Sequence, residues 1–466
     1  MTIRVLLAVV LLGSPGLCQG QGTSDPFPPI AAADGAIVVN VREFATIPDE
    51  AGEAPRLMTL VDEPGTGRLF VSTMRGGLYA ISRDGARVTK YLDIDAPDWG
   101  VRVQAGGSER GVQSIAFHPQ FAVPSTPGFG RFYTYTDTAN MASAADFPAD
   151  GEGHTHDTVL LEWTARAPGA AVYDGGPPRE LFRLAQPFSN HNGGQIGFNP
   201  LAAPGSAEFG LLYVGVADGG AGGDRYNSAQ NLASVFGKIL RIDPLGRDGA
   251  NGKYGVPASN PFAADGRDDT RGEIYAYGVR NPQRFSWDAR TGTMYVADIG
   301  QNIVEEVSPV TAGANLGWNR WEGSFTYGSR AVGLENQRGE AGLTWPVVEF
   351  DHTDPLLRRA AVTGVYVLRQ TTVPALANKL VFGDNPSGEV FWVDADHLPE
   401  GGQDAIRRVL FNDGGTPKTL LQLIRQKNSA QGRAPASRAD LRLGVGAKGE
   451  LYVLNKRDGI IRLVVE

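Results

Sequence analysis

A short strand-like run of aliphatic and aromatic residues recurs six times along this chain of 466 residues. The first residues of successive copies are 63, 80, 82, 86 and 71 positions apart, and four copies are soon followed by a second run that opens with glycine. Recurrence of this kind is typical of sheets repeated around an axis. The six runs are 69–71, 132–134, 212–214, 294–296, 380–382 and 451–453, and the glycine-led runs begin at Gly77, Gly237, Gly388 and Gly459.

The repeat predicts an all-β fold, and specifically a six-bladed β-propeller with long loops between its strands. Radial repetition protects the edges of the sheets. Each unit exceeds the roughly 40–45 residues of a compact blade repeat, so the extra residues must form loops, and such loops commonly carry function. The 61 glycines and 30 prolines, spread without a short period, suit a turn-rich β protein. A β-sandwich followed by another domain is the alternative.

The first twenty residues have the pattern of an export signal. Arg4 precedes an apolar run over residues 5–12, which is too short to span a bilayer. Cleavage is expected after Gly20, where Cys18 is the small residue at position −3. Lipid attachment to Cys18, the only cysteine, is an alternative that Leu17 disfavours because a small residue is wanted before the modified cysteine. We therefore expect a periplasmic or secreted protein with no membrane span.

The predicted domain organisation has three parts. Residues 1–20 are the signal peptide, residues 21–45 form a leader rich in Pro, Ala and Asp, and residues 46–466 form the propeller. Three stretches within the propeller are predicted insertions: 139–157, 245–270 and 399–440, the last with a short helix near residues 420–424.

Several familiar signals do not carry function here. The chain has 51 acidic and 43 basic residues and a net charge of −8, which argues against a nucleic-acid partner. Residues 444–449 match GxGxxG, but a strand follows instead of a helix, so we predict a hairpin turn instead of a dinucleotide site. His154 and His156 have no cysteine or third histidine near them, and a solvated loop is the expected environment.

The most informative stretch surrounds His191, which lies between two asparagines and is followed by two glycines. Glycines let a ligand approach the backbone closely. Asp218 ends a later strand at another glycine pair. If the two loops are neighbours, Asp218 accepts a hydrogen bond from one ring nitrogen and the other nitrogen is a basic acceptor facing a cavity. The alternative is an ordinary loop histidine and a turn-forming aspartate.

Two further clusters have ligand-binding character. Arg280 and Asn281 precede Pro282, which restricts the backbone before it, and they suit an anionic or carbonyl-rich ligand. Residues 298–302 combine a carboxylate, amides and turn carbonyls, and Glu305, Glu306 and residues 315–318 follow. Oxygen ligands at this density suit Ca²⁺. The alternative for the two glutamates is a solvated strand end.

Together these segments resemble the soluble glucose/sorbosone dehydrogenase family, the aldose sugar dehydrogenases that use pyrroloquinoline quinone (PQQ). The family fold is a six-bladed β-propeller, which agrees with the repeat count. The matching segments keep the family order over roughly residues 55–465. They are 109–111, 116–119, 191–194, 229–232, 237–243, 273–278, 281–282, 300–302 and 315–318.

The resemblance implies a catalytic role for two residues and cofactor contacts for three. His191 matches the general base that takes the proton of the sugar C1 hydroxyl while hydride passes to C5 of the quinone. Asp218 matches the carboxylate that orients this histidine. Glu109, Arg280 and Asn281 match positions that contact PQQ.

The resemblance also implies calcium. The carbonyls of Gly300 and Gln301 match those that hold the Ca²⁺ that polarises PQQ. Glu305, Glu306 and Leu316 match a second, structural Ca²⁺ site.

Two positions depart from the family pattern. Gln195 and Glu389 stand where many relatives have arginine, and Glu389 would repel a carboxylate of PQQ if it faced the cofactor. Arg358 and Arg359 lie where some relatives have a cofactor-binding lysine, so we expect Arg358 to contact PQQ.

The expected function is that of an exported quinoprotein that oxidises the C1 hydroxyl of an aldose-type sugar to the lactone and passes electrons to an external acceptor. One alternative is a Ca²⁺-dependent lactone hydrolase, in which Ca²⁺ activates water and Glu109, Asn190, Asn192 and Asp218 supply ligands. Another is a non-catalytic propeller that binds a partner.

Overall fold

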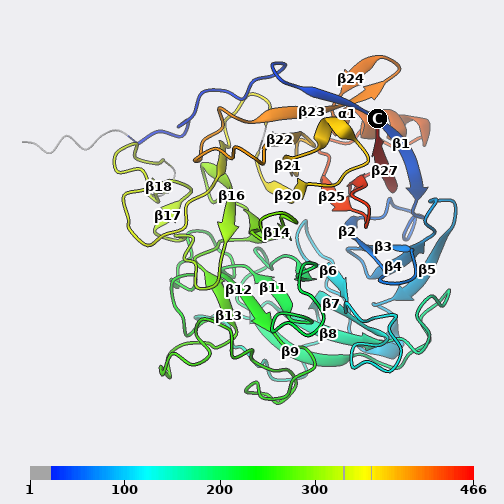
Figure 1. The fold of residues 1–466 in the computed structure, drawn as a ribbon, viewed down its shortest axis with the longest axis vertical. Helices are drawn as coiled ribbons and strands as arrows, with labels where there is room; N and C mark the ends of the chain where they lie inside the picture. The colour runs from blue at the N-terminus through cyan, green and yellow to red at the C-terminus, as the bar shows by residue number, and fades with distance from the viewer. Residues whose placement is uncertain (1–21, 329–330, 358) are drawn as a thin grey trace, which may run out of the picture.

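The computed structural model describes residues 22–328, 331–357 and 359–466. Its chain is almost entirely β-strand and loop, and Figure 1 shows the sheets arranged around a common centre. Four sheets have four antiparallel strands each. The first contains β2 to β5 (Leu57–Asp62, Leu69–Thr73, Gly77–Ile81 and Val88–Asp93), and the second contains β6 to β9 (Val112–Phe117, Arg131–Thr138, His156–Thr164 and Arg179–Gln186).

The next two sheets repeat the pattern. The third contains β10 to β13 (Ile196–Phe198, Leu212–Val216, Lys238–Ile242 and Ile274–Tyr277). The fourth contains β14, β15, β16 and β19 (Pro282–Trp287, Met294–Asp298, Val304–Val310 and Val348–Asp351). A two-stranded hairpin of β17 and β18 (Trp321–Glu322 and Phe325–Thr326) lies between β16 and β19 in the chain.

The last sheet is larger, with nine strands that come from both ends of the chain. It runs in the order β20, β21, β22, β23, β1, β27, β26, β25, and β24 pairs with β23. Strand β1 is parallel to β23 and antiparallel to β27, so it joins the strands β20 to β23 to the three strands β25 to β27. The strands are β1 (Ile37–Thr46), β20 to β24 (Val362–Leu368, Lys379–Asp384, Val390–Asp394, Arg407–Asp413 and Thr416–Lys418) and β25 to β27 (Arg442–Val445, Leu451–Leu454 and Ile460–Val465).

The sheets close into a circle through the strands nearest the centre. Strand β25 contacts β2, β2 contacts β6, β6 contacts β10, β14 contacts both β11 and β20, and β20 contacts β25. The arrangement is therefore all-β and propeller-like, as predicted. The count of six separate blades is met only in part, because hydrogen bonding joins the strands of the last two expected blades into one sheet.

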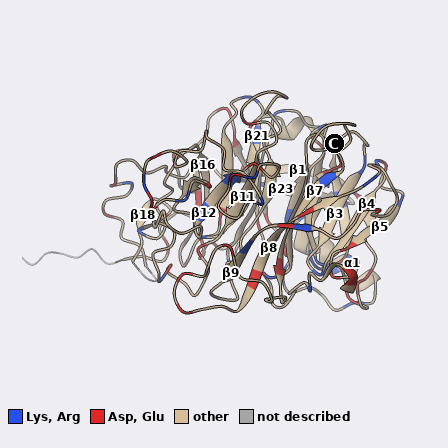
Figure 2. Cartoon of the chain, turned by 90° about the horizontal axis from the view of Figure 1, so that it is seen from below, with Lys and Arg blue, Asp and Glu red and all other residues tan. Residues whose placement is uncertain are grey.

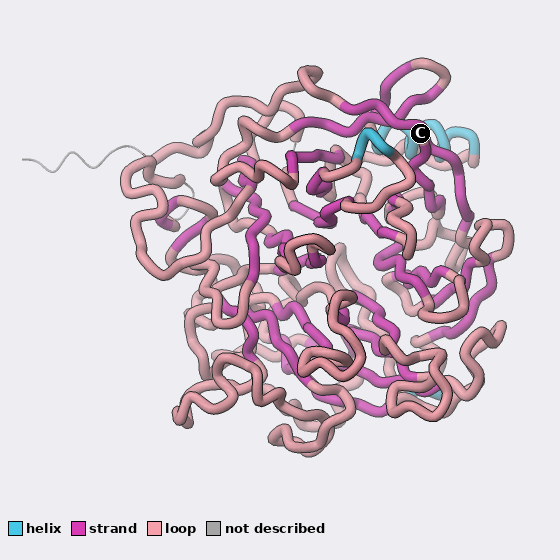
Figure 3. The backbone as a smooth tube through the Cα atoms, in the orientation of Figure 1, coloured by secondary structure: helices cyan, strands magenta, loops and turns pink. Residues whose placement is uncertain are grey.

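In the part of the chain that the structure describes, helix is confined to short segments, shown beside the strands in Figure 3. The predicted helix near residue 420 is present as α1 (Leu420–Ala430). Thr419 caps it through a capping box with Gln422, and Leu420 and Ile424 are buried. The remaining helices are single 3₁₀ turns, η1 (Pro97–Trp99) and η2 (Pro374–Leu376). None of the helices in the described residues is long and apolar enough to cross a membrane.

The predicted leader over residues 21–45 contains most of β1, so the proposed boundary with the propeller falls within a paired strand. Ahead of β1, the backbone N–H of Ile30 donates to Asp354 Oδ2 at 2.7 Å. Ile30 is therefore anchored on the loop after β19, and the exposed residues 32–35 connect it to β1. The predicted signal peptide, with Cys18 and Gly20, lies outside the described residues, and the division into domains stays a prediction.

Acidic and basic residues are both spread along the cartoon in Figure 2. The apolar side chains gather in clusters between neighbouring sheets. One of these clusters joins the two ends of the chain, where the ring of Phe44 in β1 lies 5.1 Å from the ring of Tyr452 in β26 in an edge-to-face contact.

Phe44→Ala should lower the free energy of unfolding by about 3–5 kcal/mol, because Phe44 is only 5% exposed and its removal leaves a cavity at the contact between β1 and β26. Chemical denaturation measures this change. The control is Val38→Ala on the same strand, where 49% exposure predicts a change within about 0.5 kcal/mol. Equal, small effects would mean that β1 behaves as a loose leader.

Candidate active site

The loop between β9 and β10 holds His191 in an unusual backbone conformation. His191 has φ of +53°, in the left-handed region that non-glycine residues adopt infrequently. Its backbone N–H donates to Glu109 Oε2 at 2.7 Å, and its side chain is 5% exposed. Gly193 follows with φ of +95°, and a Cβ there would lie 2.9 Å from the carbonyl oxygen of Gly215. The loop thus packs closely on β11 and turns the imidazole toward the centre.

The imidazole of His191 has a defined partner on each nitrogen. Nδ1 lies 2.7 Å from Asp218 Oδ1, and Nε2 lies 2.7 Å from Nη2 of Arg280. A guanidinium has only donors, so Nε2 is the acceptor and Nδ1 carries the proton that it donates to Asp218. The structure thus brings the predicted histidine and aspartate together. It also shows that Arg280 holds the nitrogen that was expected to face the cavity freely.

Asp218 is a fully buried carboxylate surrounded by donors. Trp318 Nε1 donates to Oδ2 at 2.9 Å, and the backbone N–H of Gly220 donates to Oδ1 at 3.0 Å. Burial acts to raise the pKa of Asp218, but His191, Arg280 and Gly220 together hold this pKa below its ordinary value. The group therefore remains an anion that orients the imidazole.

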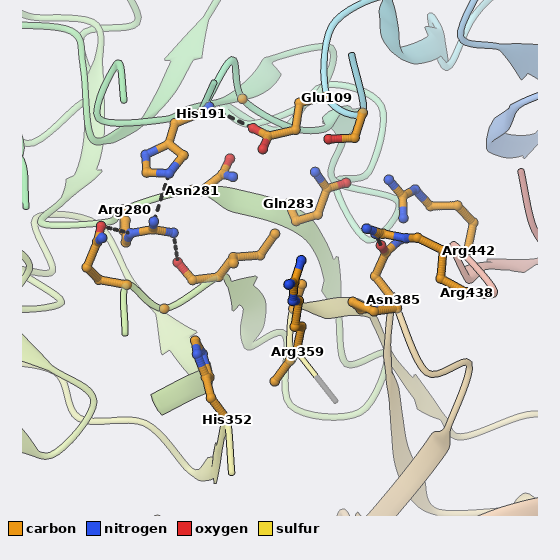
Figure 4. Close-up of a pocket in the computed structure, with 18 of the residues that line it drawn as sticks. Glu109, His191, Arg280, Asn281, Gln283, His352, Arg359, Asn385, Arg438 and Arg442 are labelled. Atoms are coloured by element: carbon orange, nitrogen blue, oxygen red, sulfur yellow. Dashed lines mark hydrogen bonds between the residues drawn. The ribbon is translucent and has the colours of Figure 1, made fainter. Parts of the chain in front are cut away.

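A second buried carboxylate positions Arg280 and Asn281. The backbone N–H groups of these two residues donate to Asp298 at 2.8 and 2.6 Å, at the end of β15. The guanidinium of Arg280 donates to Gln301 Oε1 at 2.9 Å and to the carbonyl of Ile299 at 2.8 Å. Figure 4 shows this guanidinium between His191 and the loop after β15. Asn281 Oδ1 is buried and has no hydrogen-bond partner in the described chain.

These residues line a cavity of about 270 Å³ at the centre of the ring. His191, Arg280 and Asn281 lie on one side in Figure 4, and Arg438, Arg442 and Asn385 lie on the other. Five cationic side chains line the cavity within the described residues: Arg280, Arg359, Arg438, Arg442 and Lys456. Arg358, which we predicted to contact the cofactor, lies outside the described residues, and its neighbour Arg359 lines the cavity.

At the two positions that depart from the family pattern, neither the amide of Gln195 nor the carboxylate of Glu389 lines this cavity. Gln195 exchanges hydrogen bonds with the backbone of Phe285, at 2.9 and 3.2 Å, and lines a separate cavity. Glu389 forms a two-pronged ion pair with Arg408, whose Nη2 lies 2.8 Å from Oε1. The expected repulsion from Glu389 is therefore absent, since its charge is paired with that of Arg408.

The predicted calcium ligands lie in different environments. Gly300 and Gln301 line the cavity. Glu305 is engaged through both oxygens, with His352 Nε2 at 2.6 Å and the N–H of Val362 at 2.7 Å. Leu316 is buried, and its N–H donates to the carbonyl of Tyr277 at 2.9 Å.

Glu306 stands out among these residues because it is buried and its Oε2 has no partner in the described part of the chain. Burial, and then the nearby Asp298 and Glu349, raise the pKa of Glu306 well above its ordinary value. Burial also raises the pKa of Asp298 to about 7. Glu306 therefore tends to keep its proton at neutral pH, whereas Asp298 is close to the midpoint of its titration there.

Within residues 22–328, 331–357 and 359–466, no group of three or more acidic, histidine or cysteine side chains is arranged to hold a metal ion. The calcium ligands Glu109, Asn190, Asn192 and Asp218 of the hydrolase alternative also stay a hypothesis. The calcium sites at Gly300, Gln301, Glu305, Glu306 and Leu316 stay predictions.

Several residues of the site were missed from sequence. Glu322 Oε1 accepts hydrogen bonds from the four backbone N–H groups of residues 301–304, at 2.7–3.1 Å, and so shapes the loop that contacts Arg280. Arg442 lies in β25, Arg438 precedes this strand, and Lys456 lies in the turn between β26 and β27. These residues form no local motif, and the cations between residues 438 and 457 are the one sequence signal that could have found them.

Comparison with known proteins places the chain in a family. The model of the family described as Glucose / Sorbosone dehydrogenase matches residues 53–408. A match over this share of the chain shows that the protein belongs to the glucose/sorbosone dehydrogenase family.

The curated relatives include a protein named as a sugar dehydrogenase and a protein named for an interaction. The HIPL1 protein of Arabidopsis thaliana is 29% identical over 394 residues, which cover 76% of this chain and 54% of the relative. The human Hedgehog-interacting protein is 28% identical over 226 residues, covering 48% and 29%. The aldose sugar dehydrogenase YliI of Escherichia coli is 24% identical over 229 residues, covering 48% and 54%. The chain thus spans about half the length of the first curated relatives it matches.

Solved structures with the same fold cover 92% of this chain. The PQQ-bound aldose sugar dehydrogenase of Streptomyces coelicolor has a TM-score of 0.57 at 20% identity, over 98% of its own chain. The soluble aldose sugar dehydrogenase of E. coli has a TM-score of 0.60 at 18% identity, over 99% of its own chain. At these identities the structures establish the fold.

Glu306→Gln should stabilise the protein at pH 8 and should have little effect at pH 4, which lies below the ordinary pKa of a glutamate side chain, about 4.3. The raised pKa means that the folded state binds the Glu306 proton more tightly than the unfolded state does. Stability from this group is therefore full below the unfolded pKa and falls as pH rises. Urea unfolding at both pH values measures the difference.

The exposed variant Glu400→Gln serves as the control for a simple loss of negative charge. If Ca²⁺ binds at Glu306, the result reverses: added Ca²⁺ stabilises the wild type, and Glu306→Gln destabilises it at pH 8.

Proposed function

We propose that this protein is an exported quinoprotein that oxidises the C1 hydroxyl of an aldose-type sugar to the lactone, with hydride transfer to PQQ and His191 as the general base. The observation that carries the proposal is the hydrogen-bonded series Asp218–His191–Arg280 on the wall of the central cavity. A histidine oriented by a buried carboxylate is a general base suited to neutral pH. Membership of the family and its fold support the same reaction class.

The described residues of the cavity fit PQQ, a planar quinone with three carboxylates. The side opposite His191 presents the guanidinium groups of Arg438 and Arg442, and Nε of Arg442 is buried without a hydrogen-bond partner in the described residues. Guanidinium groups bind carboxylates through two parallel hydrogen bonds. A ligand that is anionic at one end would therefore place its other end toward His191. We propose Arg359, Arg438 and Arg442 as the groups that hold the carboxylates, beside Glu109, Arg280 and Asn281 at the quinone.

Bound PQQ would supply a two-electron acceptor, which no side chain of the protein offers. His191 contributes the base, because its Nδ1–H is fixed on Asp218 and its Nε2 lone pair points to the cavity. Nε2 accepts from Arg280 in this structure, so the sugar hydroxyl must displace that N–H before its proton can reach His191. Arg280 is held in place by Gln301 and Ile299, and its positive charge favours an anionic product at the quinone end.

We also propose that each half of the nine-stranded sheet is one blade, which makes six blades with β1 completing the last. The C-terminal half consists of β25, β26, β27 and β1, and the other half consists of β20 to β23. Export to the periplasm or beyond, an external electron acceptor, and Ca²⁺ at the carbonyls of Gly300 and Gln301 belong to the same proposal. No step above requires the calcium ion.

PQQ should raise the melting temperature of the purified protein through preferential binding to the folded state, by an amount equivalent to about 2.7 kcal/mol at one hundred times its Kd. The titration is done with Ca²⁺ and with a chelator, which tests the calcium prediction separately. The absence of any shift with PQQ would overturn the proposed cofactor.

His191→Ala should lower kcat for sugar oxidation by about 10²–10⁴-fold, since a general base contributes a factor of that size. PQQ binding should persist, because the cations that hold its carboxylates remain. Turnover with a panel of aldoses and an artificial electron acceptor measures the first effect, and the thermal shift measures the second. His397→Ala is the control, with a side chain 87% exposed. Unchanged turnover in His191→Ala would remove this residue from the mechanism.

A second candidate, a propeller that binds a partner without catalysis, has one observation in its favour. The relatives with the highest identities to this chain include the human Hedgehog-interacting protein, whose name describes an interaction and not a reaction. A protein that neither binds PQQ nor turns over any sugar in these assays would favour this candidate.

A further inference from the structure

Lys456 is a buried amine on the wall of the central cavity that the proposed reaction does not use. It lies in the turn between β26 and β27, is 6% exposed, and lines the cavity. Within the described residues it has no carboxylate oxygen within ion-pair distance. A buried lysine without an anionic partner is uncommon, because desolvation of an ammonium ion is costly unless it is paired.

The contacts of Lys456 suit an uncharged amine. Nζ donates to the carbonyl of Ser108 at 3.1 Å and contacts Met74 Sδ at 3.5 Å, which is a weak acceptor. An ammonium group has three N–H donors, and one of them would remain unsatisfied. An amine has two N–H donors, which these two acceptors occupy, and one lone pair.

The charges around Lys456 also favour the uncharged form. Arg442, Arg56 and Arg284 are close enough to repel an ammonium ion, and Asp440 is the one carboxylate that opposes them. Arg438 and Arg457 already form ion pairs with the two oxygens of Asp440.

Arg442 and Arg284 have no ion pair in the described chain, and their guanidinium groups donate to backbone carbonyls of Leu441 and Met58 and to Gln283. The positive field at Lys456 therefore remains strong. Burial first, and then Arg442, hold the pKa of Lys456 well below its ordinary value.

We propose that Lys456 is a nucleophile of the central cavity, whose amine forms a reversible imine with a bound aldehyde or ketone that carries negative charge. A desolvated lysine beside other cations is an activated nucleophile. Negative charge on the ligand follows from Arg359, Arg438 and Arg442, which line the same cavity. The inference rests on the cavity and not on the proposed oxidation.

The chemical step requires no oxidant or reductant. The Nζ lone pair forms a bond to the carbonyl carbon, and the π electrons of the C=O bond move to oxygen. One amine proton passes to that oxygen and gives a carbinolamine. A second proton and the hydroxyl group leave as water, and the C=N bond forms. Hydrolysis reverses these steps and returns the amine and the carbonyl compound.

Pyridoxal 5′-phosphate, an aldehyde with a phosphate group, provides the test. The cofactor-free protein is treated with this reagent at a series of pH values, reduced with sodium borohydride to fix any imine, and digested for peptide mass spectrometry. Lys448, in an exposed turn, is the internal control. At pH 7 we expect Lys456 to be labelled at least about tenfold faster than Lys448, because an ordinary lysine with a pKa near 10.4 is almost wholly protonated at that pH.

The pH profile separates nucleophilic activation from simple access. Labelling of Lys456 should reach its plateau at a lower pH than labelling of Lys448, which should continue to rise above pH 9. Arg442→Met should shift the plateau of Lys456 labelling to higher pH, since it removes the charge that repels an ammonium ion at Lys456 most strongly. Glyceraldehyde, which is neutral, should label Lys456 more slowly than the phosphate-bearing aldehyde.

Three results would overturn the proposal: no label on Lys456 while Lys448 is labelled, the same pH profile for both lysines, or equal labelling of Lys456 by the neutral and anionic aldehydes. The wild-type profile alone decides the first two, so the test survives a variant that does not fold. Because no PQQ is present, failure here leaves the proposed oxidation untouched, and failure of the oxidation assay leaves this result untouched.

Discussion

The hydrogen bond from His191 Nδ1–H to the buried carboxylate of Asp218 is the interaction on which the site depends. It fixes the tautomer of the imidazole, and therefore makes Nε2 an acceptor that only a donor can approach. Arg280 takes that position, which in turn requires the backbone of residues 280 and 281 to be held by Asp298. Loss of the Asp218 charge would leave the imidazole free to change tautomer, and Arg280 would then face a donor.

Buried carboxyls and buried cations around the cavity lie in different halves of the ring. The loop after β15 and the strands near it carry buried carboxyls. Glu322 Oε1 accepts hydrogen bonds from backbone N–H groups, whereas Glu322 Oε2 and Glu306 Oε2 have no hydrogen-bond partner in the described residues. The C-terminal sheet carries Arg442 and Lys456, which lack ion pairs in the described chain. Burying unpaired charges of either sign costs several kcal/mol. In both halves this cost is reduced because the pKa values of the buried groups shift toward the uncharged form. A bound anion would reduce the cost further in the cationic half.

The parts of this arrangement that sequence could predict are those with local signals. A strand ending at a glycine pair identified Asp218, and the amide and glycine neighbours identified His191, since each pattern lies within a few residues. The six recurring runs predicted an all-β ring. The helix near residue 420 was visible because apolar positions and a capping threonine share one short segment. The number of separate sheets could not be predicted from the sequence, because the parallel pairing of β1 with β23 depends on ring closure.

Ring closure also explains what the sequence could not reveal about the cavity. Residues 438–456 reach the wall opposite His191 only because the C-terminal sheet contacts β2 and β20 across the closing point. The direction in which a side chain points also depends on residues far away in the sequence. The carboxylate of Glu389 points away from the cavity because it forms an ion pair with Arg408 on the neighbouring strand. Read from the sequence alone, the charge of Glu389 looks adverse for an anionic ligand, but in the folded chain this charge is paired with Arg408. The basic side chains that line the cavity come from segments without a sequence motif. The charge distribution of the cavity therefore follows from the topology of the fold and not from any single segment.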